Sequence, residues 1–111
     1  MTGAELITAE REHQITSEGW TAEHDDQWTE GQLVDAACCY ATFANHPARE
    51  YYRRKYSGAG YIAIGSARWP FDISWWKPSA GDDINGRILE LVKAGALIAA
   101  EIDRLKRLEV K

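Results

Sequence analysis

A chain of 111 residues has room for one domain with a modest core, so we expect residues 1–111 to form a single domain. The composition, 45% hydrophobic and 27% charged, is that of an ordinary globular protein, and the net charge of −4 disfavours binding to bulk nucleic acid. No apolar run reaches the ~18 residues that a membrane span needs, and the first ten residues lack a signal-peptide pattern. The sequence therefore predicts a cytoplasmic protein with no membrane partner.

The first predicted helix covers residues 3–18. Thr2 and Glu5 have the spacing of a capping box, which favours a helix start at this point. Gly19 is typical of a helix end. Residues 20–28 follow as a predicted loop that is rich in hydrogen-bonding side chains.

A second helix is predicted to start at a further capping box, formed by Thr29 and Gln32, and to end before Pro47. Its apolar residues recur at helical period: Leu33, Val34, Ala37, Cys38 and Ala41. The adjacent Cys38 and Cys39 do not suit disulfide geometry, so we expect two reduced, half-buried thiols.

The middle of the chain gives weaker signals. A short helix is predicted from Pro47 through Tyr56, followed by a break at residues 57–60 and a brief extended segment at residues 61–64. Residues 69–78 form a predicted irregular connector with four aromatic rings and two prolines.

The last predicted helix is the longest, with about 25 residues and a length of roughly 38 Å. Asp82 and Asp83 lie at its start and basic residues lie near its end, as the helix dipole prefers. One apolar stripe runs along it: Ile84, Ile88, Leu91, Val92, Gly95, Ile98, Ala99, Ile102 and Leu105. Small residues at 94–96 and 99–100 permit close helix approach, so a homodimer through this helix is a hypothesis. Together these elements predict a mainly α fold, a small bundle of three to four helices with a long C-terminal helix and an irregular aromatic connector.

Three segments carry candidate ligand-binding residues. The first supplies Arg11, Gln14, Glu18, Trp20, His24, Asp25 and Asp26. His24 with the two aspartates suits a divalent cation, an acid or base oriented by a carboxylate, or a ligand contact without chemistry. The alternative is a structural loop that caps the second helix.

The second segment, residues 51–56, alternates tyrosines with Arg53 and Arg54, which suits phosphates and stacked bases. Its alternative is an exposed amphipathic helix. The third is the connector, where Trp69, Trp75, Trp76 and Lys77 could close over a planar ligand or cover a small core.

Four segments resemble a family of small bacteriophage and prophage proteins: E-R-x-x-Q at 10–14, E-G-W-T-x-E-H-D-D at 18–26, W-W-K-P at 75–78 and L-V-K-A-G-A-L-I-x-A-E-I at 91–102. This resemblance implies a phage-encoded protein in the cytoplasm of a bacterial host, with an accessory or anti-defence role.

Two weaker resemblances concern chemistry. The E-R-x-x-Q and L-V-x-A helices are similar to those of MazG-type pyrophosphohydrolases, which hold magnesium with paired acids; here only Glu23 and Asp26 have that spacing. The segment at 18–20 resembles RyR-type repeat domains, which implies recognition of nucleotide-derived ligands.

We therefore expect a non-catalytic protein that binds a small nucleotide-like ligand and needs no cofactor, and that sequesters a host immune signalling nucleotide. One alternative is a magnesium-dependent pyrophosphohydrolase with Glu10, Asp25, Asp26 and Glu101 as ligands. Another is an inhibitor that binds a host enzyme through exposed tryptophans.

Overall fold

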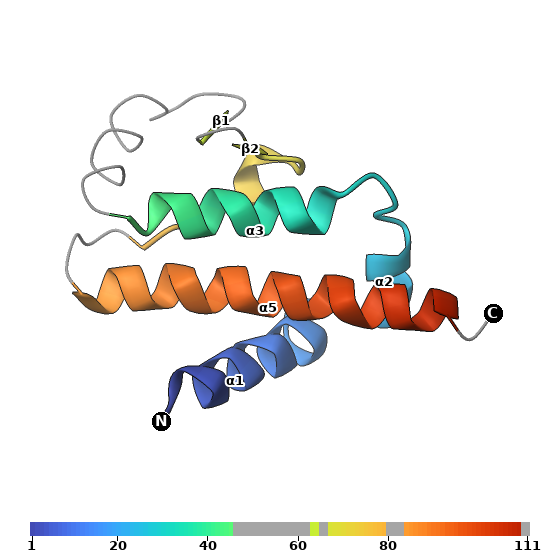
Figure 1. Ribbon diagram of the computed structural model, residues 1–111, viewed down its shortest axis with the longest axis horizontal. Coiled ribbons are helices and arrows are strands. Elements are labelled where there is room, and N and C mark those ends of the chain that lie inside the picture. Colours follow the sequence, from blue (N-terminus) through green and yellow to red (C-terminus); the bar gives the residue numbers. More distant parts are fainter. Residues whose placement is uncertain (46–62, 65–66, 80–83, 110–111) are drawn as a thin grey trace.

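The computed structural model describes residues 1–45, 63–64, 67–79 and 84–109. These residues are mainly helical and form four α-helices: α1 (Gly3–Thr16), α2 (Ala22–Asp26), α3 (Gln32–Phe43) and α5 (Ile84–Glu109). The helix α5 lies antiparallel beside α3, and α1 crosses α5 on the side away from α3 (Figure 1). The predicted mainly α fold with a long C-terminal helix is confirmed.

The first helix begins as predicted. The backbone N–H of Glu5 donates to the hydroxyl of Thr2, and the N–H of Thr2 donates to the carboxylate of Glu5, which completes a capping box. The helix ends at Thr16, two residues before the predicted end. Gly19 then adopts a left-handed φ of 77°, which turns the chain so that Trp20 follows at the start of the next segment.

The predicted loop at residues 20–28 is wrong in part, because it contains the five-residue helix α2. The hydroxyl of Thr21 accepts the backbone N–H of His24 and so caps this helix. Such a short helix has no apolar period, and its polar composition therefore suggested a loop. The helix places His24 and Asp25 next to each other on a rigid element.

The helix α3 starts without the capping box that Thr29 and Gln32 predicted. Its N-cap is Gly31, with φ of 83°, and the Gln32 side chain accepts the N–H of Glu30 instead. The residues buried on it are Leu33, Ala36, Ala37, Cys39, Tyr40 and Phe43. Val34 and Cys38, predicted on the core side, are exposed. Both cysteines are free thiols, as expected, but Cys39 alone is buried.

The predicted apolar stripe of α5 is not its core side. Its large aliphatic side chains, Ile84, Ile88, Leu91, Ile98, Ile102 and Leu105, are each 40–72% exposed. The buried residues are mainly small or charged: Gly86, Glu90, Ala94, Ala96, Leu97, Ala100 and Arg104. Because small side chains allow helix axes to approach, α3 packs on this narrow side and the bulky aliphatics remain outside.

The small residues of α5 also accommodate α1. A Cβ at Gly95 would lie 2.6 Å from Cδ1 of Ile7, closer than real contacts allow. The helix α1 therefore crosses α5 at the only position of the stripe that has no side chain.

The connector packs on α3, and its end reaches α5, where Lys93 donates to the carbonyl oxygen of Lys77. A two-residue strand β1 (Ala63–Ile64) pairs antiparallel with β2 (Ala67–Arg68), and a single 3-10 turn η1 (Ile73–Trp75) follows. Trp69 and Trp76 pack on Tyr40 of α3, with ring centroids 5.5 and 4.7 Å away, so part of the connector completes the core.

Several predictions concern residues that the structure does not describe. The predicted helix from Pro47 through Tyr56, the break at 57–60, the first half of the extended segment at 61–64, and Asp82 and Asp83 lie outside the described residues. Among the helices that are described, none is both long and apolar enough to cross a membrane.

Candidate functional site

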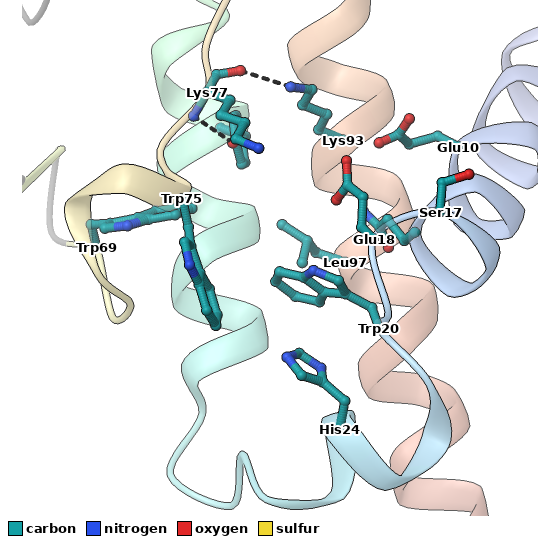
Figure 2. A pocket seen from close by; sticks show the side chains of 12 residues that line it. Glu10, Ser17, Glu18, Trp20, His24, Trp69, Trp75, Lys77, Lys93 and Leu97 are labelled. Carbon is teal, nitrogen blue, oxygen red and sulfur yellow. Dashed lines mark hydrogen bonds between the residues drawn. The ribbon is translucent and has the colours of Figure 1, made fainter.

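A cavity of about 440 Å³ opens between α1, the segment that follows it, α3, the connector and α5. Its volume falls within the range of small-molecule sites, ~300–1,000 Å³. Aromatic rings form one end and charged side chains form the other (Figure 2). Both ends belong to one hollow, so a single ligand can contact rings and charges together.

Trp20 and Trp75 form the aromatic end, from opposite sides of the cavity. Their ring centroids are 5.8 Å apart with planes tilted by 56°, and the His24 ring lies 4.7 Å from that of Trp20. To hold a third ring between them, two rings must be separated by roughly 7 Å, which is two stacking contacts of ~3.5 Å. A planar ligand therefore has to lie against these indoles instead of between them. Trp75 is 39% exposed, so part of its surface is available to a ligand.

Lysines and glutamates form the charged end. The ammonium of Lys93 donates to the carbonyl oxygen of Lys77 at 2.7 Å, and the carboxylates of Glu10 and Glu18 lie on the α1 side (Figure 2). Burial raises the pKa of Glu10, and the nearby charge of Glu18 raises it further. Burial lowers the pKa of Lys93, while the two glutamates act in the opposite direction. Two carboxylates and two ammonium groups leave this end close to neutral.

Tyr40 supplies a hydroxyl to the cavity. Its oxygen accepts the backbone N–H of Lys77 at 3.0 Å, and burial raises its pKa to about 12. The hydroxyl therefore keeps its proton at neutral pH, and that proton is available to an acceptor on a ligand.

A buried ion pair holds the His24 side of the cavity. Arg11 Nη2 lies 2.8 Å from Oδ2 of Asp25, and Oδ1 of Asp25 lies 3.0 Å from Nδ1 of His24. Arg11 Nη1 also donates to Gln14 Oε1 and to the carbonyl oxygen of Trp20, each at 3.4 Å. Arg11 and Asp25 thus brace the wall, while Gln14, Trp20 and His24 line the cavity.

The structure brings together seven of the thirteen predicted ligand-binding residues at this cavity: Gln14, Glu18, Trp20, His24, Trp69, Trp75 and Lys77. Arg11 and Asp25 lie behind the wall. Asp26 pairs with Arg107 at 2.7 Å, and Trp76 stacks on Tyr40. Arg53 and Arg54 lie outside the described residues.

Sequence reasoning missed several residues that line the cavity: Ser17, Tyr40, Lys93 and Leu97, and Glu10 as a ligand-binding residue. Lys93 and Leu97 are four residues apart on α5, on the side that faces α3. The core side of α5 was predicted to be its stripe of bulky aliphatic residues, which contains neither Lys93 nor Leu97, and both were therefore missed. Tyr40 lies three residues after Ala37, which was correctly predicted to be buried, so its direction could have been inferred.

Three of the four carboxylates suggested as magnesium ligands have other partners, while Glu10 lines the cavity. Asp25 pairs with Arg11, Asp26 with Arg107 and Glu101 with Arg104, the last at 2.6 Å. In the described part of the chain, no group of three or more His, Cys, Asp or Glu side chains is arranged to hold a metal ion.

The protein is thus small and mainly helical, and it has a cavity of the size of a small ligand with an aromatic end and a charged end that is close to neutral overall. Comparison with models of known families, with curated proteins and with solved structures finds no match for this chain.

Proposed function

We propose that the protein binds a small nucleotide-like molecule in this cavity and does not convert it chemically. The observation that carries the proposal is the division of one cavity into an aromatic end and a charged end. Indole faces suit a heterocyclic base, because base–aromatic stacking contributes ~1–3 kcal/mol per base. Carboxylates suit sugar hydroxyls, and ammonium groups suit phosphate oxygens.

The charges favour a ligand with few phosphates. Lys77 and Lys93 face Glu10 and Glu18 in the same end, and Arg11 is paired with Asp25. A triphosphate would bring several negative charges toward two carboxylates with only two ammonium groups to balance them. We therefore expect nucleosides and nucleoside monophosphates, cyclic ones included, to bind more tightly than triphosphates.

The test is isothermal titration calorimetry, with thermal shift as a screen, on nucleosides, linear and cyclic monophosphates, and triphosphates. Saturable binding with one ligand per chain, weakened by Trp75→Ala, supports the proposal. Trp76→Phe is the matched control, because Trp76 lies in the same connector but does not line the cavity. If no compound in the panel binds or stabilises the protein, the proposal is wrong.

We also propose the biological setting that the sequence resemblance implies. A phage-encoded protein with this cavity would sequester a host signalling nucleotide and so weaken a nucleotide-triggered defence. Expression in a bacterium that carries such a defence, with and without Trp75→Ala, tests this setting: the unaltered protein should permit phage growth and the variant should not. Equal phage growth with both would contradict it.

A second proposal concerns the exposed aliphatic stripe of α5, which we assign to contact with a second copy of this chain. Each half of the stripe has spacings of four and then three residues, as in a coiled-coil seam: Ile84, Ile88 and Leu91 form one half, and Ile98, Ile102 and Leu105 the other. Ile7 of α1 covers the Gly95 position, so the two halves of the stripe flank a residue of α1. Light scattering should give the mass of a dimer, whereas a monomer that captures a host protein would identify the stripe as a surface for that partner.

A further inference from the structure

Among the residues that the structure describes, the imidazole of His24 is hydrogen-bonded at one nitrogen, Nδ1. Its Nδ1 lies 3.0 Å from Oδ1 of Asp25, whose other oxygen accepts from the guanidinium of Arg11 at 2.8 Å. The Asp25 side chain is completely buried, and its charge is compensated by Arg11. An ionised carboxylate only accepts hydrogen bonds, so the neutral imidazole must carry its proton on Nδ1.

The second nitrogen, Nε2, is therefore an acceptor. In the described part of the chain it has no hydrogen-bond partner, although the His24 side chain is only 19% exposed and lines the cavity. Figure 2 shows the ring at the aromatic end, next to Trp20.

Aromatic neighbours prevent the ring from turning to another partner. The His24 ring centroid lies 4.7 Å from that of Trp20, 5.9 Å from Trp28 and 6.1 Å from Trp75. A half-turn of the ring would also break its bond to Asp25, which is buried and would then lack that partner. The direction of the Nε2 lone pair is thus set before any ligand arrives.

We infer that His24 Nε2 is a specificity-determining acceptor, so that the ligand's ring must carry an N–H donor on the edge that faces it. This inference rests on the proposed function, and it narrows the ligand class to heterocycles with an imino or amino donor at that edge. Arg11 and Asp25 are positioning residues for this contact, since neither lines the cavity.

The same geometry explains why a nucleobase lacking this donor would be rejected. If a methyl group replaces the N–H, the bound ligand covers Nε2 with an apolar group, and this acceptor is left without a hydrogen bond. An acceptor left without a partner in such a site disfavours the wrong ligand more strongly than a lost apolar contact does.

The first measurement needs no ligand. Long-range ¹⁵N–¹H correlation spectra of the free, full-length protein distinguish the two imidazole tautomers, and His24→Phe identifies the His24 signals among those of three histidines. We expect the Nδ1–H tautomer at a pH where the ring is neutral. Predominance of the Nε2–H tautomer would overturn the inference.

The second measurement compares a nucleoside that binds with its analogue methylated at the edge N–H. We expect methylation to weaken binding about tenfold or more in the unaltered protein, and to matter little in His24→Phe, which keeps a ring of similar size without an acceptor. His13→Phe is the control: His13 is exposed on α1 and does not line the cavity, so discrimination should persist.

The outcomes separate this inference from the proposed function. If nucleosides bind but methylation has the same effect in the unaltered protein and in His24→Phe, the inference is wrong and the proposed function stands. If no nucleoside binds, both are wrong. Asp25→Asn gives a further check where it folds: an amide turned with its NH₂ toward Nδ1 would reverse the tautomer and reduce the discrimination.

Discussion

Arg11 and Asp25 form an ion pair inside the protein, with guanidinium Nη2 2.8 Å from carboxylate Oδ2 and the Asp25 side chain fully buried. The pair joins α1 to α2. The neighbouring acid of α2, Asp26, forms a pair of similar length with Arg107 of α5, but at the protein surface. One short helix thus holds a buried and an exposed version of the same interaction.

We predict that Arg11→Met lowers the free energy of unfolding by about 3–5 kcal/mol, because it leaves a buried carboxylate without its counter-charge. Urea unfolding followed by circular dichroism measures this change. Arg107→Met is the matched control, and should lower it by less than about 1 kcal/mol because its pair is exposed. Equal losses of unfolding free energy in the two variants would show that the burial of Asp25 does not determine how much its ion pair contributes to stability.

Trp75 lines the cavity but does not belong to the buried core cluster, so its replacement tests ligand binding in the cavity. Because Trp75 is 39% exposed but packs on the rings of Trp20 and Phe71, Trp75→Ala should lower the free energy of unfolding by about 1–3 kcal/mol and leave the protein folded. The loss of stacking should weaken a bound nucleoside by ~1–3 kcal/mol, roughly tenfold or more in dissociation constant. Titration calorimetry measures the affinity, and unchanged affinity would mean that the ligand does not contact this ring.

Local signals predicted the helices better than the sides they bury. The capping box of Thr2 and Glu5 identified the start of α1, since it depends only on residues three apart. The side of α5 that packs on α3 depends on the partner helix, which bulky aliphatic spacing alone does not reveal. Small residues such as Ala94 and Ala100 lie at the helix contact because α3 approaches closely there.

In the candidate site, too, local sequence features were predictable and contacts between distant elements were not. The polar segment after α1 did indicate the cavity wall, since Trp20 and His24 line it. Which acids face the cavity was not predictable, because Asp25 and Asp26 are directed by arginines from α1 and α5, and these pairings arise only in the folded chain.

Gly95 offers a test of the contact between α1 and α5. In the original chain, Gly95→Ala places a Cβ 2.6 Å from Ile7 Cδ1, and overpacking costs ~1–3 kcal/mol, so the gain in helix propensity is offset. In an Ile7→Ala background the same change should stabilise the protein by about 1 kcal/mol. Thermal unfolding of the four proteins measures this coupling, and its absence would mean that Ile7 does not pack on Gly95.

The exposed stripe of α5 predicts a dimer that single charges disrupt. Ile98 and Ile102 are 48% and 52% exposed, so Ile98→Glu or Ile102→Glu should leave the helical content unchanged and convert a dimer into a monomer. Sedimentation velocity measures the mass. As a control, Glu12→Lys changes an exposed charge on α1 and should keep the dimer. A stripe variant that stays dimeric would place the interface elsewhere.

Glu10 gives the protein a pH-dependent stability whose sign is set by burial. Its pKa is raised above 4.5, so the folded state holds the proton more tightly than the unfolded state. The free energy of unfolding should therefore fall as pH rises through and just above 4.5. Glu10→Gln removes the ionisable group, and should be more stable than the original chain at pH ~7, by less than about 1 kcal/mol because Glu10 is only half-buried. Urea unfolding at several pH values should show this advantage vanish below the unfolded-state pKa, where Glu10 is neutral in both states. The exposed Glu12→Gln should show no such trend, and an advantage for Glu10→Gln that persists in acid would point to packing instead of charge.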